Sequence, residues 1–330
     1  MAETAGQREM RRMRQEIDSL RRQRDILKKS PGHCVGRDAR KRFEVIDAMK
    51  DEHPVTEMAD ALEVSASGYA DHQIKGECPR RQEDLRIGED LKTAFEQSRR
   101  TCGSPRLRVA LRQKGWRAGK NPIARLQRIP GLRPARKRHW RPRTTQSDPR
   151  LRVAENWLAK IPAPDRPGQI RAADIPYGET REGWLCLPAI MDLFSRKIVG
   201  WNTAADLATP LVTRAWDKAW KNRRPSPGLL HHSDRGSQYA SGAFQALLGN
   251  HGAAASMSRK GNCCDNAAME SFRATLKTEC FGTCVPKTKH EARLMIFDSI
   301  EAFHNRSRLH SCLGYKSPLE FESLTNYHLN

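Results

Sequence analysis

The sequence lacks the features that mark a membrane or secreted protein. No apolar run approaches the roughly 20 residues that a helix needs to cross a bilayer, so a membrane role is set aside. The nine cysteines are odd in number and scattered, and they do not form two pairs at zinc-finger spacing. This usage is typical of reduced thiols in the cytosol rather than of a disulfide framework. We therefore expect a cytoplasmic protein with neither disulfides nor structural zinc.

Acidic side chains are absent from residues 99–143, which contain sixteen lysines and arginines. The 330-residue chain has a formal net charge of +21. Residues 1–150 hold 36 basic and 21 acidic side chains, a balance of +15, which leaves +6 for residues 151–330. Basic surfaces bind phosphate backbones by releasing counterions, largely without regard to sequence. A polyanion is the expected partner, although charge alone also describes ribosomal and membrane-surface proteins.

The acid-free stretch predicts a basic helix-turn-helix followed by an extended arm. Ser104 and Pro105 are typical of a helix start, Gly115 of its end, and a second helix is expected from about Asn121. The arm over residues 133–143 favours backbone contact without base reading, and a solvated linker is the alternative. The candidate phosphate contacts of the two parts are Arg106, Arg108, Arg112, Arg125, Arg128, Arg136, Lys137 and Arg138.

The residues that precede this basic unit have a different character. Residues 55–73 predict a helix, a turn at 63–65 and a second helix, but residues 51–90 carry four basic and eleven acidic side chains. Phosphate would be repelled, so a structural or protein-contact role is favoured over DNA reading. Residues 8–29 predict a helix with apolar residues at heptad spacing, either a short coiled coil or an amphipathic helix docked on its own domain.

Three carboxylates near the ends of predicted elements are the candidate site. Asp174 lies in the predicted strand 170–177, and Asp234 follows a short apolar strand that a glycine-containing turn ends. Glu270 lies on a predicted helix, off its buried stripe, and 35 residues separate it from Asp234. Three converging carboxylates favour Mg²⁺ or Mn²⁺, and two such ions can hold the attacking and leaving oxygens of a phosphoryl transfer. Taken singly, each of these residues has a surface or capping role as its default interpretation.

Residues near these carboxylates are expected to have supporting or structural roles. His232 is expected to support the site by hydrogen bonding and His231 to point to the other face of the sheet. Asp265 is interpreted as a helix cap and Glu279 as a surface residue. Lys277, about two turns beyond Glu270, is a further candidate phosphate contact.

The order of elements predicts an α/β layered core. Three consecutive antiparallel strands, at 170–177, 184–192 and 197–206, are followed by helices alternating with strands. The expected segments are a partial zipper helix, a first helix-turn-helix, the basic helix-turn-helix with its arm, a linker and the catalytic core. The zipper helix is expected over residues 1–30, the first helix-turn-helix over 31–95 and the basic helix-turn-helix with its arm over 96–145. The linker is expected over residues 146–168 and the catalytic core over 169–330.

Several motifs in a fixed order resemble the DDE transposases of bacterial insertion sequences of the two-frame OrfA/OrfB group, relatives of retroviral integrases. The motifs are DIPY at 174–177, DLFSRKIVGW at 192–201, HSDRGSQY at 232–239, GNCCDNAAMESF at 261–272 and NRSRLHSCLGYKSP at 305–318. The basic stretch also resembles that group's second helix-turn-helix. The resemblance implies a ribonuclease H-like core whose catalytic triad maps onto Asp174, Asp234 and Glu270.

The resemblance also implies an activity and partners. Metal-dependent cleavage and strand transfer at the inverted-repeat ends are expected, with Mg²⁺ or Mn²⁺, two ions in all, as cofactor. Synapsis of two ends requires at least a homodimer, and an upstream-frame protein of the element is a possible partner in the bacterial nucleoid. The counterpart of residues 304–318 lies beside the active site, so Arg306 and Arg308 are candidate DNA contacts, with packing under the core helix as the alternative.

Some residues depart from the pattern of that group. Arg171 stands where tryptophan is usual, Pro176 replaces threonine, Pro188 falls inside a predicted strand, Cys264 replaces an aromatic residue and Arg273 replaces phenylalanine. These departures support a second hypothesis, a catalytically impaired DNA-binding relic or regulator of the element. A ribonuclease H-type nuclease is the third hypothesis, and strand-transfer products would distinguish a transposase from it.

Overall fold

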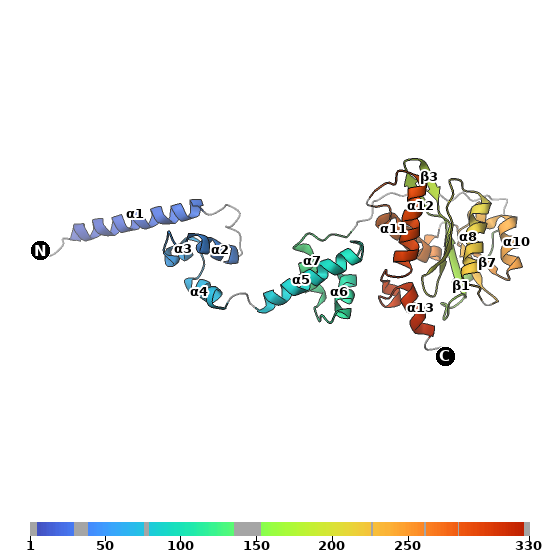
Figure 1. Ribbon diagram of the computed structural model, residues 1–330, viewed down its shortest axis with the longest axis horizontal. Coiled ribbons are helices and arrows are strands. Elements are labelled where there is room, and N and C mark those ends of the chain that lie inside the picture. Colours follow the sequence, from blue (N-terminus) through green and yellow to red (C-terminus); the bar gives the residue numbers. More distant parts are fainter. Residues whose placement is uncertain are drawn as a thin grey trace. The chain divides into compact units, whose positions relative to one another are not determined.

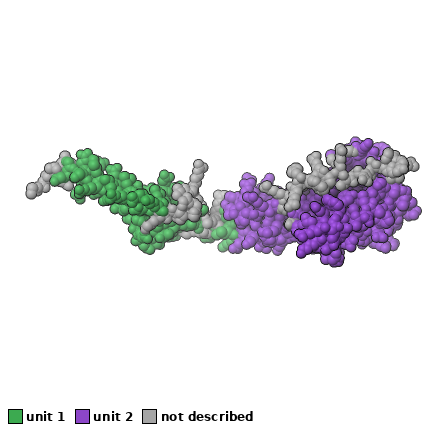
Figure 2. Space-filling model, turned by 90° about the horizontal axis from the view of Figure 1, so that it is seen from above, with its two compact units in different colours: residues 1–86 green, residues 87–330 purple. Residues whose placement is uncertain are grey.

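The computed structural model describes residues 5–29, 39–75, 79–134, 153–225, 227–260, 262–282 and 284–326 (Figure 1). They fall into two compact units, residues 1–86 and residues 87–330 (Figure 2). The predicted arm residues Arg136, Lys137 and Arg138 lie outside the described residues. None of the described helices combines the length and apolar character that crossing a membrane would require.

The first unit is helical and its core is small. Ile26 near the end of the first helix is buried with Ile46 and Met58, while Met10 and Met13 of the predicted heptad seam are more than half exposed. The predicted turn is present, with Glu63 at a positive φ of 53°. The helix prediction for residues 8–29 is confirmed, and only its last turns dock on its own domain. The helices are α1 (Ala5–Lys29), α2 (Ala39–Met49), α3 (Val55–Ala61) and α4 (Ala66–Lys75).

The basic helix-turn-helix opens the second unit and is a three-helix bundle. Leu91 and Phe95 of the preceding helix pack on Leu107 and Ile123, and all four are buried. The predicted end of the middle helix is confirmed, because Gly115 takes the positive φ of 91° that glycine adopts without strain. The helices are α5 (Pro79–Gln97), whose residues from Ile87 onward belong to this unit, α6 (Ser104–Gln113) and α7 (Lys120–Arg128).

A five-stranded mixed sheet forms the centre of the remaining residues, in the order β5-β4-β1-β6-β7. The central strand β1 pairs antiparallel with β4 and parallel with β6, and β6 pairs parallel with β7. This arrangement is the ribonuclease H-like topology that was predicted. The strands are β1 (Ile170–Asp174), β4 (Ala189–Asp192), β5 (Ile198–Trp201), β6 (Leu230–Ser233) and β7 (Ala254–Met257).

The prediction of three uninterrupted strands was wrong in one respect. The separate hairpin β2 (Tyr177–Thr180) and β3 (Gly183–Cys186) lies between β1 and β4. Pro188 therefore falls between β3 and β4 rather than inside a strand, and its carbonyl accepts a hydrogen bond from the Asn202 N–H at 3.1 Å. Since a proline between strands removes no ladder hydrogen bond, this departure gives no reason to expect a damaged sheet.

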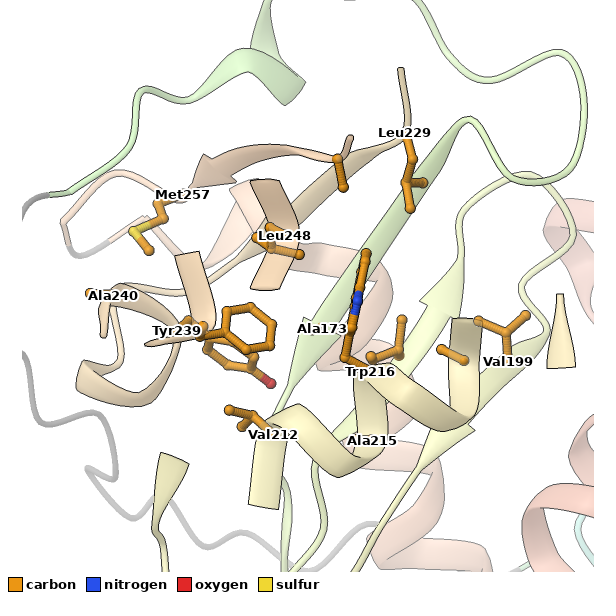
Figure 3. Packing of buried hydrophobic residues seen from close by; sticks show 14 residues of the cluster. Ala173, Val199, Val212, Ala215, Trp216, Leu229, Tyr239, Ala240, Leu248 and Met257 are labelled. Carbon is orange, nitrogen blue, oxygen red and sulfur yellow. The ribbon is translucent and has the colours of Figure 1, made fainter. Parts of the chain in front are cut away.

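Helices cover both faces of the sheet (Figure 1). On one face Trp216 and Tyr239 pack with Phe244 in an aromatic cluster (Figure 3). Gly200 lets its strand approach this layer, because an added Cβ would lie 2.5 Å from the Ala215 carbonyl oxygen. The helices of this face are α8 (Thr209–Asn222), α9 (Ser237–Ala240) and α10 (Gly242–Asn250).

The opposite face of the sheet carries the helix on which Glu270 lies. Met269, Phe272 and Leu276 form its buried stripe, as predicted, and they pack with Ile296 and Ile300. The elements of this face are α11 (Ala267–Glu279), α12 (Lys289–Phe297) and a π-helical segment (Asp298–His304), and the chain continues to α13 (Pro318–Asn326).

Candidate active site

The carboxyl ends of two parallel strands bring the first two carboxylates together. The parallel register pairs Arg171 with His231 and Ala172 with His232, so both strands run toward the same edge of the sheet. Asp174 is the last residue of β1, and Asp234 directly follows β6, as predicted. Strand ends that meet at one edge of a sheet are a common place for a functional site.

Asp174 is a buried carboxylate with one unsatisfied oxygen. Its Oδ1 accepts a hydrogen bond from the Ile175 N–H at 2.8 Å, whereas its buried Oδ2 has no partner among the described residues. Burial raises the pKa of Asp174 to about 7; the positive charge of Arg273 opposes this shift, and the charges of Asp234 and Glu270 add to it. A buried acceptor without a donor is costly. The position suits a proton or a cation.

Asp234 is held by the turn that follows it. Its Oδ1 accepts a hydrogen bond from the Gly236 N–H at 3.0 Å, and a Cβ at Gly236 would lie only 3.0 Å from the same oxygen. The ring of Tyr239 lies in the aromatic cluster that covers one face of the sheet (Figure 3). Burial raises the pKa of Tyr239 well above its ordinary value, and the charges of Asp234 and Asp174 add to this shift. The phenol is therefore neutral.

The start of α11 is attached to β1 directly beside Asp174. The side-chain amide of Asn266 donates a hydrogen bond to the Ala173 carbonyl at 3.0 Å, and Asn266 is buried. The predicted capping by Asp265 was wrong, because its carboxylate accepts hydrogen bonds from the backbone and guanidinium of Arg259. Asn262 caps the preceding 3₁₀ turn through the Cys264 N–H, not α11 itself.

Glu270 pairs with a cation on its own helix. The Arg273 Nη2 donates to the Glu270 Oε2 at 2.6 Å, and the two side chains are 29% and 39% exposed. Burial and the charge of Arg273 lower the pKa of Lys277, against the opposing effects of Asp174 and Glu270. Both cations thus lie close to the carboxylates. Arg273 was noted only as a departure from the family pattern; its i,i+3 spacing from Glu270 was the signal for this contact.

The three carboxylates do not form a closed metal cage. Within the described residues, no three Asp, Glu, His or Cys side chains converge closely enough to hold a metal ion. Asp174 and Asp234 interact electrostatically, as do Asp174 and Glu270. Their oxygens are the donor type that a hard divalent cation prefers, and the unsatisfied Oδ2 of Asp174 fits such a ligand.

The two histidines of β6 serve the packing of the sheet. The His232 ring nitrogens bond the hydroxyls of Ser256 at 2.9 Å and Ser258 at 3.0 Å, so the predicted hydrogen bonding toward the carboxylates was wrong. His231 packs edge-on against Trp216 with ring centroids 5.0 Å apart, on the face of α8, as predicted. Burial lowers the pKa of His231 to about 3 and that of His232 to about 4.

Two of the predicted phosphate contacts lie against Glu279. The Arg308 guanidinium donates to its carboxylate at 2.7 and 2.8 Å, and Arg106 lies 3.7 Å away. The Glu279 side chain is 10% exposed, so its interpretation as a surface residue was wrong. For Arg308, the alternative of packing against the core is the one found. Lys277 and Arg108 are partly buried, whereas the remaining described candidates, Arg112, Arg125, Arg128 and Arg306, are exposed.

The residue at the usual tryptophan position takes part in a buried charge network. Arg171 is fully buried on β1 and donates to the Arg223 carbonyl at 2.6 Å. Arg223 lies 3.7 Å from the buried Asp192 and pairs with Glu322 through two hydrogen bonds of 2.6 Å. The Asp192 carboxylate also accepts a hydrogen bond from the Phe194 N–H at 3.0 Å. Cys264, another departure, is exposed.

Family models match most of the second unit. Two models described as integrase core domain match residues 164–263 and 251–318, and an HTH-like domain model matches residues 80–140. Among solved structures, the chain is similar to the HTLV-2 integrase catalytic core domain in complex with magnesium in its dimeric form. The identity is 14%, the match covers 48% of this chain and 98% of that one, and the TM-score is 0.35.

Curated relatives are much closer in sequence. The insertion element IS600 uncharacterized 31 kDa protein of Shigella sonnei is 40% identical over 82% of this chain and 98% of its own. The transposase for insertion sequence element IS904 of Lactococcus lactis subsp. lactis (strain IL1403) is 37% identical over 72% and 93%. Transposase InsF for insertion sequence IS3A of Escherichia coli (strain K12) is 38% identical over 70% and 80%. The chain belongs to the insertion-sequence transposases with an integrase catalytic core.

Proposed function

We propose that Asp174, Asp234 and Glu270 are the catalytic carboxylates with which this transposase cleaves DNA at the inverted repeats of its element. The freed 3′-hydroxyl then attacks a second phosphodiester, which joins the strands. The observation that carries the proposal is the unsatisfied Oδ2 of Asp174, which is buried at the end of β1, beside the strand that Asp234 follows and where α11 is attached. No covalent intermediate with the protein is needed, because the nucleophiles are water and a DNA hydroxyl.

Enzymes with an integrase core use divalent metal ions. We propose that the three carboxylates hold Mg²⁺ or Mn²⁺, two ions in all, which would activate the attacking water and stabilise charge on the leaving oxygen. The residues fit such ligands, since each offers carboxylate oxygens and Asp174 is costly to ionise without a cation. At neutral pH, where the Asp174 pKa of about 7 leaves it partly protonated, a bound cation would favour the ionised form.

We propose that the substrate of this site is a strongly charged DNA duplex and that the basic helices contribute to holding it. We assign phosphate contact to the exposed Arg112, Arg125 and Arg128 of α6 and α7, and to Arg306 and Lys277 near the core. Arg106 and Arg308 have a structural role through Glu279 in addition to any DNA contact. The arm with Arg136, Lys137 and Arg138 remains a sequence prediction.

Two ends of an element must be held at once, so the active form is at least a dimer. The exposed heptad seam of α1, with Met10, Met13 and Ile17, supports a contribution of this helix to assembly. An upstream-frame protein of the same element is a second possible partner. The DNA substrate would place the protein at the bacterial nucleoid.

The test uses purified protein, Mg²⁺ or Mn²⁺, and labelled DNA that carries the flanking inverted repeats. Cleavage and joining at the repeat should disappear in Asp234→Asn and in Glu270→Gln. The matched control is Asp206→Asn, which changes an exposed carboxylate of the same core and should keep activity.

Each other outcome has a distinct meaning. Activity that survives in both variants would place the chemistry elsewhere. Cleavage without joining would favour a nuclease. Binding without chemistry, under both metals and with the upstream-frame protein added, would favour the regulator, the alternative that the Glu270–Arg273 pair supports.

A further inference from the structure

One cation has a direct bond to a proposed metal ligand. Arg273 lies one turn after Glu270 on α11, and its Nη2 is 2.6 Å from the Glu270 Oε2. Both side chains are between one quarter and two fifths exposed, so the pair is neither sealed in the core nor freely solvated. A short, charge-assisted hydrogen bond of this kind orients the carboxylate as well as neutralising it.

The influence of Arg273 extends beyond Glu270. Its positive charge opposes the rise in the pKa of Asp174 that burial causes, and it lowers the pKa of Lys277. The guanidinium therefore lies within electrostatic reach of the strand carboxylate and of the second cation. Arg273 thus supplies positive charge beside the same carboxylates that would hold a divalent ion.

A guanidinium and a divalent ion compete for the same oxygens. An arginine side chain stays charged under all ordinary conditions, so it cannot give up its carboxylate by losing a proton. Glu270 must turn away from Arg273, or share its oxygens, before it can coordinate a metal. The Glu270 Oε2 already accepts a hydrogen bond from this helical neighbour.

We propose that Arg273 is an internal competitor for the metal ion, because it holds Glu270 in an ion pair that has to open or be shared when the site is loaded. The inference rests on the proposed catalytic role of Asp174, Asp234 and Glu270. Its consequence is a metal affinity lower than the three carboxylates would have alone. A partly exposed ion pair should lower that affinity by about two- to fivefold.

The experiment titrates the full chain with Mn²⁺ and follows the electron paramagnetic resonance signal of the unbound ion. The pH is kept well above 7, so that Asp174 is ionised in every variant. Arg273→Gln should bind Mn²⁺ about two- to fivefold more tightly than wild type. Arg273→Lys keeps a competing charge and should lie between the two.

The matched control is Arg259→Gln. It removes the same single charge from another ion pair of the core, the one with Asp265 at 2.9 Å, and leaves the Glu270 pair intact. Its Mn²⁺ affinity should change less than that of Arg273→Gln. An equal gain in Mn²⁺ affinity in both variants would mean that the loss of any positive charge from the core has this effect. That result would overturn the proposal.

Asp174→Asn separates the two levels of the inference. If Mn²⁺ binding to wild type does not depend on Asp174, the proposed catalytic site itself fails. If Mn²⁺ binding depends on Asp174 but Arg273→Gln leaves the affinity unchanged or weaker, the proposed competition by Arg273 is wrong. The proposed carboxylate site is then retained. Asp174-dependent binding in Arg273→Gln also shows that this variant has folded.

Discussion

The two sides of the candidate site are built differently. On the strand side, Asp174 ends β1 and Asp234 directly follows the parallel neighbour β6, and Asp174 is 9% exposed. On the helix side, Glu270 has a 39% exposed side chain that bonds Arg273 of the same helix. The backbone of the sheet therefore positions the strand carboxylates. The orientation of Glu270 depends instead on whether its side chain bonds Arg273 or the proposed metal ion. The proposed binding of metal would therefore require rearrangement mainly on the helix side.

The largest effect on stability should come from the buried strand carboxylate. Its pKa of about 7 lies above the ordinary value of 3.8, so the folded state prefers the protonated form. The free energy of unfolding should fall as pH rises from about 4 to about 7, by up to about 4 kcal/mol from this group. Asp174→Asn removes this loss and should stabilise the metal-free protein at high pH while abolishing activity.

Urea unfolding of wild type and Asp174→Asn, at pH values below 4 and above 7, measures this difference. The matched comparison is Glu270→Gln, which removes the more exposed carboxylate of the same candidate site. If the free energy of unfolding varies with pH in the same way in wild type and in Asp174→Asn, burial does not disfavour the ionised form of Asp174. The contrast between the strand side and the helix side of the site would then disappear.

A smaller effect is expected at the other end of α11. Glu279→Gln should lower the free energy of unfolding by about 1–3 kcal/mol, because it leaves the 13% exposed guanidinium of Arg308 without its carboxylate. Asp298→Asn, which weakens the more exposed pair with Arg99, should cost less than about 1 kcal/mol. Chemical denaturation at neutral pH measures both. Equal costs would mean that burial of the Glu279 pair contributes little.

The smallest effect concerns DNA binding. An exposed arginine should contribute more to it than an arginine that lies against a carboxylate of the protein. Arg112→Gln should weaken DNA binding severalfold and reduce the salt slope of the binding constant by about 1, as expected for one phosphate contact. Arg106→Gln, which lies beside Glu279, should change that slope less. Fluorescence anisotropy at several salt concentrations measures both slopes, and equal changes would assign Arg106 to DNA as well.

The sequence was informative where chemistry follows a local pattern. Strand ends, a glycine turn and the apolar stripe of Met269, Phe272 and Leu276 predicted the elements that carry the three carboxylates. The ribonuclease H-like topology was predicted from the family resemblance. The spacing of apolar residues predicts single helices and strands but does not indicate how they are arranged. Only the structure gave the environment of each carboxylate, because burial and partner charges depend on residues distant in the chain.

The errors share a physical cause. The hairpin β2–β3 was merged into longer strands because apolar runs do not reveal where hydrogen-bonded partners change. Glu279 was assigned to the surface because its arginine partners come from α6 and from the segment after the π-helix, which periodicity on α11 cannot indicate. Arg273 could have been found, since its spacing of three residues from Glu270 is a local signal.

The most direct test of the three-carboxylate site is anomalous diffraction from crystals of the protein with Mn²⁺. The account predicts a peak between Asp174 and Asp234, with the Glu270 carboxylate turned to the metal and away from Arg273. A peak elsewhere, or a fully loaded site in which Glu270 takes no part, would contradict it.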